Sequence, residues 1–133
     1  MAVHGRALRD GCVHIAPGGT HLRLGRDWRI ELVDEPASVH RPSADQLFES
    51  VALNARDRGV GVILTGMGDD GAAGLAAMHR VGSLTIAQDQ ATSAVFGMPR
   101  AAQRLGAVDQ QLPLGGIAAA ILRGARSRSP VAS

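Results

Sequence analysis

A glycine-rich stretch from residue 59 to residue 74 constrains the fold of this chain more than any other part of the sequence. It reads Gly-Val-Gly-Val-Ile-Leu-Thr-Gly-Met-Gly-Asp-Asp-Gly-Ala-Ala-Gly. The apolar run at 60–64 does not alternate with polar residues, which is typical of a strand covered on both faces. The glycines after it permit a tight turn, and the alanines after the turn begin a helix. The stretch therefore predicts a buried strand, a turn and a helix, the building unit of an α/β fold.

The residues before this stretch predict a small ribbon and a helix. A helix is expected from Ser43 to Arg58, because apolar residues recur at helical spacing and Gly59 ends the pattern. Gln46 lies three residues after Ser43, which is the spacing of a capping box. Turn residues upstream separate short extended pieces, which we expect at 12–16, 21–24 and 28–33.

The residues after the stretch repeat strand and helix. The expected order is helix, strand, helix, short strand and helix, at 71–79, 83–87, from Met98, at 105–108 and at 114–123. This order predicts right-handed parallel crossovers. Only three or four such units fit into 133 residues. We therefore expect an α/β fold of the doubly wound, Rossmann-like type with a mostly parallel sheet, truncated on its amino-terminal side.

Composition argues against several classes of protein. Apolar residues make up 45% of the chain and charged residues 20%, which is ordinary for a soluble globular protein. The formal net charge is only +2 and the arginines are scattered among acids, so we expect no nucleic-acid partner. No apolar run is long enough for a bilayer, and residues 1–10 lack the apolar block of a signal peptide, so we expect a cytoplasmic protein without membrane insertion. Cys12 is the only cysteine, which excludes an internal disulfide.

The glycine turn is compatible with three kinds of site. The first is a dinucleotide site, because Gly-x-Gly-x-x-Gly at 66–71 follows a strand and Asp89 ends the next one. Asp69 and Asp70 oppose this interpretation, since each like-charge contact with a pyrophosphate costs about 4 kcal/mol. The second is a cation site on the same three aspartates, but their spacing resembles no ion-binding loop. We expect neither a metal nor a cofactor.

The third kind of site is a hydrolase triad, in which a buried acid orients a histidine. An aspartate in a rigid turn at a strand end suits that role. The sequence contains no Gly-x-Ser-x-Gly elbow to present a nucleophile. By residue type alone, the candidates for nucleophile and base are Ser43, Ser83, Ser93, His4, His14, His21, His40 and His79.

Several motifs resemble the catalytic domain of the CheB-type chemotaxis receptor methylesterases. The most specific is the turn Leu-Thr-Gly-Met-Gly-Asp-Asp-Gly-Ala at 64–72. The others are Ile-Ala-Pro-Gly-Gly-Thr-His-Leu at 15–22, Arg-Pro-Ser-Ala-Asp-Gln-Leu-Phe at 41–48, Ile-Ala-Gln-Asp at 86–89 and Phe-Gly-Met-Pro at 96–99. The resemblance covers nearly the whole chain, from about Gly11 to Leu122. It implies a doubly wound parallel sheet with helices on both faces.

The resemblance also implies an activity and its residues. Members of the family hydrolyse methyl esters on receptor glutamates, and deamidate certain receptor glutamines, through a Ser-His-Asp triad. The acid belongs to the Gly-Met-Gly-x-Asp-Gly turn, which makes Asp70 the triad acid. Met67 is expected to lend its backbone N–H to the oxyanion hole, a contribution of roughly 3 kcal/mol. Asp69 occupies the variable position, and we expect it to cap the following helix. The implied partner is the cytoplasmic domain of a methyl-accepting chemotaxis receptor.

The chain also departs from the family pattern. It contains neither the Gly-x-Ser-x-Gly-Gly-like turn of the nucleophile nor the Gln-His-Met-like segment of the histidine. We therefore expect residues 1–123 to form a partial methylesterase catalytic domain, its carboxyl-terminal two-thirds, and residues 124–133 a disordered tail. Such a chain should be inactive alone and could self-associate through an exposed sheet edge. The alternative is a non-catalytic module of the same fold that binds a receptor or another partner.

Overall fold

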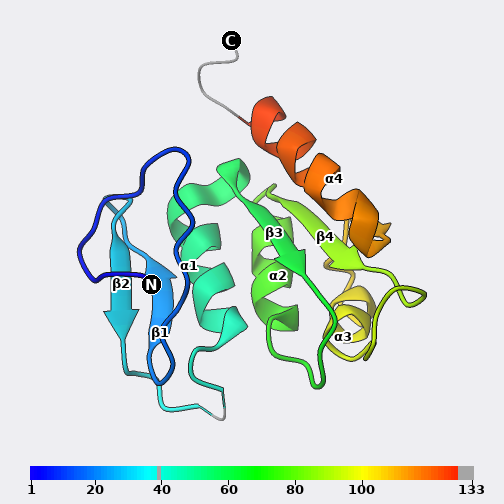
Figure 1. The fold of residues 1–133 in the computed structure, drawn as a ribbon, viewed down its shortest axis with the longest axis horizontal. Coiled ribbons are helices and arrows are strands. Elements are labelled where there is room, and N and C mark those ends of the chain that lie inside the picture. The colour runs from blue at the N-terminus through cyan, green and yellow to red at the C-terminus, as the bar shows by residue number, and fades with distance from the viewer. Residues whose placement is uncertain (39, 129–133) are drawn as a thin grey trace.

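A three-stranded parallel sheet forms the centre of the fold, in a computed structural model that describes residues 1–38 and 40–128 (Figure 1). Its strand order is β3-β4-β5, and the strands are β3 (Val60–Ile63), β4 (Leu84–Gln88) and β5 (Gln110–Leu112). The helices α2 (Ala72–Arg80) and α3 (Met98–Arg104) pack on one face, and α4 (Leu114–Ser127) packs on the other. The predicted α/β fold with helices on both faces is confirmed.

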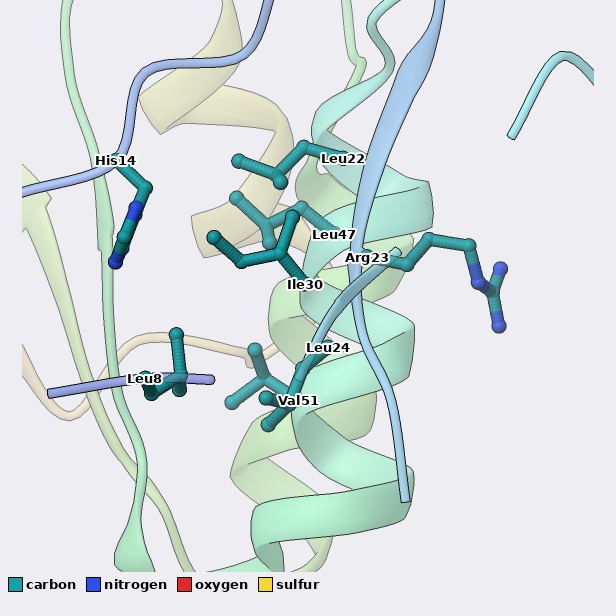
Figure 2. A pocket seen from close by; sticks show the side chains of 8 residues that line it. All are labelled: Leu8, His14, Leu22, Arg23, Leu24, Ile30, Leu47 and Val51. Atoms are coloured by element: carbon teal, nitrogen blue, oxygen red, sulfur yellow. The ribbon is translucent and has the colours of Figure 1, made fainter. Parts of the chain in front are cut away.

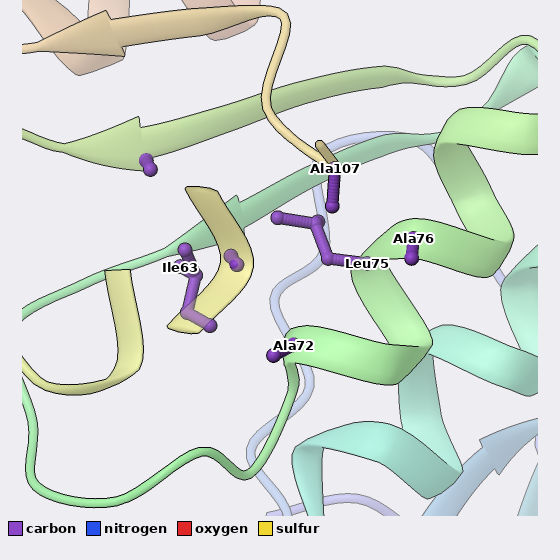
Figure 3. Close-up of a cluster of buried hydrophobic side chains, with 7 residues drawn as sticks. Ile63, Ala72, Leu75, Ala76 and Ala107 are labelled. Carbon is purple, nitrogen blue, oxygen red and sulfur yellow. The ribbon is translucent and has the colours of Figure 1, made fainter. Parts of the chain in front are cut away.

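Strand β3 sends alternate side chains into two apolar cores. Ile63 packs under α2 and α3 in the cluster of Figure 3, which consists of Ile63, Ala72, Leu75, Ala76, Ala87, Ala102 and Ala107. Val60 and Val62 pack against the α4 cluster on the opposite face. Because both faces are covered, the strand needs no polar alternation, which explains its unbroken apolar run.

A glycine in β3 sets how closely α2 approaches the sheet. A Cβ on Gly61 would lie 2.7 Å from Cδ1 of Leu75 and 2.9 Å from Sδ of Met78. Both partners are fully buried side chains of α2. The glycine at this position therefore permits a strand-to-helix contact that a larger residue would push apart.

A separate antiparallel ribbon and a long helix precede the parallel sheet. The ribbon pairs β1 (His21–Leu24) with β2 (Ile30–Val33). The helix α1 (Ala44–Ala55), continued by a 3-10 turn η1 (Arg56–Arg58), lies between this ribbon and α2 and contacts both (Figure 1). The extended piece expected at 12–16 is not a strand. The Ala2 N–H donates a hydrogen bond to the carbonyl of Ile15 in this piece.

Two predicted boundaries near the end of the chain are wrong. The strand expected at 105–108 begins later, as β5, because the Ala107 N–H still bonds back to Ala102 at the end of α3 and pairing with β4 starts beyond Asp109. Helix α4 continues past the predicted end at Arg123 to Ser127. Gly124 favours this continuation, since it lets the helix lie directly against Leu84. Residues 129–133 of the predicted tail lie outside the described residues.

Strand β3 is also an edge of the sheet. It pairs in parallel with β4 on one side, with Val60 opposite Leu84 and Ile63 opposite Ala87. Within residues 1–38 and 40–128, no strand pairs with its other side. None of the described helices has both the length and the apolar character needed to cross a membrane.

Candidate functional site

The glycine turn lies at the carboxyl end of β3, where α/β sheets bind their ligands. The turn is fixed to the segment that precedes α3. The Gly66 N–H donates to the carbonyl of Val95 at 3.0 Å, and the Gly66 carbonyl accepts from Gly97 at 3.1 Å and Met98 at 2.8 Å. A Cβ on Gly97 would lie 2.6 Å from that carbonyl, so only glycine fits there. Two of the motifs in the sequence, at 64–72 and 96–99, thus form one rigid surface.

The carboxylate of Asp70 accepts three hydrogen bonds from the start of α1. Its Oδ1 accepts from the Ser43 hydroxyl at 2.8 Å and from the Asp45 N–H at 3.2 Å. Its Oδ2 accepts from the Ala44 N–H at 2.7 Å. Burial raises the pKa of this carboxyl, but these hydrogen bonds and the charge of His40 together hold it below the ordinary aspartate value. The lowered pKa means that Asp70 is ionised at neutral pH. A carboxylate has about four lone-pair positions, so Asp70 can accept one further hydrogen bond.

Helix α1 in turn provides a carboxylate acceptor for the start of helix α2. The carboxylate of Asp45 accepts from the Gly71 N–H at 3.0 Å and from the Gly74 N–H at 2.7 Å. The two helices cross closely here, since a Cβ on Gly74 would lie 2.7 Å from Cβ of Phe48. The turn that precedes α2 therefore provides the acid that caps α1, and α1 provides the acid that caps α2.

This reciprocal capping corrects two sequence predictions. The capping box is wrong: the Ser43 hydroxyl donates to Asp70, and Oε1 of Gln46 accepts from Arg23 at 2.6 Å instead of returning to the helix start. The cap of α2 was expected from Asp69, but it comes from Asp45. Asp69 is exposed, and its side chain makes no hydrogen bond within the described part of the chain. Asp45 was missed, although it lies inside a family motif.

Met67, the predicted oxyanion donor, lies at the open tip of the turn. Its side chain is 77% exposed. Neither a backbone nor a side-chain acceptor takes its N–H among residues 1–38 and 40–128. The neighbouring Gly68 has a φ of 83°, a conformation that favours glycine. The Met67 N–H therefore has no acceptor among the described residues.

The structure brings Ser43, His21 and Asp70 together, but not as a catalytic triad. Nδ1 of His21 lies 3.1 Å from the backbone N–H of Ser43, and its Nε2 lies 2.8 Å from the carbonyl of Pro36. The Ser43 hydroxyl donates directly to Asp70. A triad needs the histidine between the hydroxyl and the acid, so His21 cannot act as the base of Ser43.

The candidates Ser83, Ser93 and His79 make their contacts with residues other than Asp70. The hydroxyl of Ser83 donates to the carbonyl of Arg56, and the hydroxyl of Ser93 donates to the carbonyl of Asp89 at 2.7 Å. Nδ1 of His79 lies 3.1 Å from Oδ1 of Asp109, near the amino end of β4. No set of three His, Cys, Asp or Glu side chains in the described part of the chain is placed to hold a metal ion.

Two of the pockets in the described part of the chain differ in chemistry. A pocket of about 350 Å³ adjoins the glycine turn, and its charged lining residues are Asp45, Asp69 and Arg104. A pocket of about 240 Å³ is mainly apolar and lies between the ribbon and α1 (Figure 2), lined by Leu8, His14, Leu22, Arg23, Leu24, Ile30, Leu47 and Val51. Neither Asp70 nor Met67 lines the apolar pocket, so it is separate from the candidate site.

The chain is an α/β protein with a parallel sheet, and Asp70 and Met67 lie at the carboxyl edge of that sheet, where proteins of this class commonly bind ligands. A model of the CheB methylesterase family matches residues 1–121. The chain belongs to this family of chemotaxis methylesterases, as its motifs predicted.

Named relatives agree with this assignment. The chain is 51% identical over 132 residues to protein-glutamate methylesterase/protein-glutamine glutaminase 2 of Bordetella avium, with 96% of this chain and 38% of the relative covered. It is 46% identical to a corresponding enzyme of Rhodopseudomonas palustris, covering 98% of this chain and 37% of the relative. The chain thus spans somewhat over a third of the length of these relatives.

A solved structure confirms the fold. The CheB methylesterase catalytic domain of Thermotoga maritima superposes with a TM-score of 0.84 at 32% identity. The match covers 92% of this chain and 67% of that domain. The covered share agrees with the two-thirds of a catalytic domain predicted from the motifs.

The hydrogen bonds of Asp70 predict how stability depends on pH. Because folding lowers its pKa, the carboxylate stabilises the folded chain above the unfolded-state pKa of about 4, and this contribution is lost as pH falls below that value. Asp70→Asn should therefore cost about 1 to 2 kcal/mol at pH 7 and progressively less in acid. Urea unfolding of both proteins at several pH values measures the difference. The exposed Asp69→Asn variant is the control and should change stability by less than about 0.5 kcal/mol. A cost of Asp70→Asn that is the same at every pH would contradict the prediction.

Proposed function

We propose that this chain supplies the acid and one oxyanion-hole donor of a protein-glutamate methylesterase. Asp70 is the acid and the Met67 N–H is the donor. The observation that carries the proposal concerns the Asp70 carboxylate, which lies in the glycine turn typical of the family. This carboxylate is ionised and accepts hydrogen bonds from three donors at the start of α1. The serine and histidine of the reaction belong to motifs that this sequence does not contain.

The role of each residue follows from acyl transfer to water. When the serine attacks the ester carbonyl, its proton passes to the histidine, and the methanol leaves with a proton returned by that histidine. Asp70 keeps the histidine in the tautomer that can accept the proton and stabilises the imidazolium that forms. The Met67 N–H donates to the carbonyl oxygen as that oxygen becomes negative. Water then releases the glutamate by the same steps.

The proposed substrates are γ-glutamyl methyl esters on the cytoplasmic domain of a methyl-accepting chemotaxis receptor. The names of the relatives include both methylesterase and glutaminase activities. Deamidation of a glutamine is the same acyl transfer with ammonia in place of methanol as the leaving group. A receptor substrate of this kind places the protein in the cytoplasm.

Methanol release tests the proposal at the level of the chain. The 133-residue chain alone should release no methanol above background from methylated receptor, because it lacks the serine and histidine motifs of the family. A chimera in which this chain replaces the matching segment of the Bordetella avium enzyme should release methanol at a rate within about tenfold of that enzyme. An inactive but folded chimera would contradict the proposal, and so would methanol release by the chain alone that Asp70→Ala abolishes.

A second candidate is a non-catalytic binding module of the same fold. The observation in its favour is that capping of α1 by itself accounts for all three hydrogen bonds of Asp70. The free edge of β3 could serve such a module in pairing with a partner or with a second copy. A pull-down with receptor cytoplasmic fragments, read together with methanol release, distinguishes the two candidates. A binding module retains the receptor, and replacing Asp70 by Asn in the active chimera leaves its methanol release unchanged, whereas the proposed function predicts a large loss of methanol release.

A further inference from the structure

The histidine at the start of β1 has both ring nitrogens engaged in the interior of the protein. His21 is fully buried, with 0% of its surface exposed. The mechanism above does not use it. One nitrogen faces a backbone N–H that can only donate, and the other faces a backbone carbonyl that can only accept. These partners require Nδ1 without a proton and Nε2 with one, which is a neutral imidazole.

Two hydrogen bonds of Ser43, one from its backbone and one from its side chain, connect this histidine to Asp70. The Pro36 carbonyl accepts from Nε2 of His21 at 2.8 Å. Nδ1 of His21 accepts from the Ser43 N–H at 3.1 Å. The Ser43 hydroxyl donates to Asp70 at 2.8 Å. Ser43 is itself buried, with 8% exposed, so it has little freedom to replace either contact with water.

We propose that His21, as the neutral Nε2–H tautomer, is a positioning residue for the Asp70 carboxylate and acts on it through Ser43. The role rests on the proposed function, in which that carboxylate orients the catalytic histidine. Fixing the Ser43 backbone also fixes the N–H groups of Ala44 and Asp45, the other two donors to the same carboxylate. One buried imidazole thus sets the position of all three donors.

Other contacts hold α1 to the ribbon, so the role of His21 is confined to the start of the helix. The Leu24 N–H donates to the Ser50 hydroxyl at 2.8 Å, and the Asn54 amide donates to the Leu24 carbonyl at 2.8 Å. These contacts lie about two and three turns further along α1 than Ser43. Loss of His21 should therefore leave α1 attached while its first residues gain freedom.

Carbon-13 NMR titration of the Asp70 carboxyl in the 133-residue chain tests the role of His21. In His21→Leu the pKa of Asp70 should rise toward the ordinary aspartate value, because its three donors are no longer held in place. In His21→Asn it should stay close to the native value, because the amide oxygen can replace Nδ1 as the acceptor of the Ser43 N–H. His4→Leu is the matched control, since Nδ1 of the exposed His4 accepts from the Leu32 N–H at 3.0 Å without any connection to Asp70.

Two outcomes of these NMR measurements would overturn the proposal. The first is a folded His21→Leu chain in which Asp70 titrates as in the native protein. The second is independent of whether that variant folds: a nitrogen-15 spectrum of the native chain at neutral pH that shows a proton on Nδ1 of His21. An unprotonated Nδ1 and a protonated Nε2 would support it.

Kinetics in the active chimera separate the positioning role from the proposed function. His21→Leu should lower kcat by up to about a hundredfold with little change in KM, and His21→Asn should restore most of it. An unchanged kcat in His21→Leu, when Asp70→Asn is inactive, would overturn the positioning role alone. If Asp70→Asn is also fully active, the proposed function fails, and the NMR result still stands as a statement about the carboxylate.

Discussion

Asp70→Asn in the active chimera should lower kcat for methyl-ester hydrolysis by about 10³ to 10⁴-fold. An amide in place of the acid can hold the wrong tautomer of the catalytic histidine and cannot stabilise its charged form. The introduced amide either places its NH₂ group, a donor, against the Ala44 N–H or rotates away from it. The site therefore loses a hydrogen bond as well as the negative charge. Methanol release from methylated receptor measures the change, and KM should move far less than kcat.

Two neighbouring aspartates serve as controls for this substitution. Asp69→Asn alters the adjacent, exposed carboxylate and should leave kcat within about threefold. Asp45→Ala removes the reciprocal cap of α2, since Oδ1 of Asp45 accepts both hydrogen bonds from the start of that helix, and it should cost similar stability while sparing most of the activity. Equal losses of activity in Asp45→Ala and Asp70→Asn would show that Asp70 acts only as a helix cap.

Met67→Pro should lower kcat by about 10² to 10³-fold, because proline has no N–H to donate to the oxyanion. The substitution breaks no hydrogen bond of the described residues, since the Met67 N–H has no acceptor among them. The preceding residue, Gly66, tolerates the restriction that a following proline imposes. Methanol release from the chimera measures kcat, and thermal melting checks that the fold is retained.

Met67→Ala is the matched control for the oxyanion prediction. It keeps the N–H and removes only a side chain that is 77% exposed. Its kcat should stay within about threefold of the parent chimera. Loss of activity in Met67→Ala as large as in Met67→Pro would assign the role to the side chain in place of the backbone donor.

The layout of the parallel sheet could be predicted because its signals are local. The apolar run that became β3, the glycine turn and the start of α3 at Met98 each depend on residues within a few positions of one another. Where an element depends on partners far away in the sequence, its observed boundary differs from the predicted one. The last strand formed at Gln110–Leu112 and not at 105–108, because its start is set by pairing with β4.

Membership of the family could also be predicted from the sequence, through motifs. The turn at 64–72 singled out Asp70 and Met67, and the structure places both at the carboxyl end of β3. Their catalytic roles remain predictions for the experiments above. Motifs gave no role to His21 or Asp45, although both lie within them.

The sequence by itself determined the α/β fold, the order of its elements and membership of the family, because strand, turn and helix signals are short-range and the motifs are contiguous. Only the tertiary structure decided which acid serves which helix. Asp70 and Asp45 are 25 residues apart along the chain, and each finds the other's helix only after α1 and α2 have packed. A free N–H at a helix start can donate to any carboxylate that packing brings within hydrogen-bond reach. The glycine turn predicted the acid, and packing decided that the start of α1 holds it.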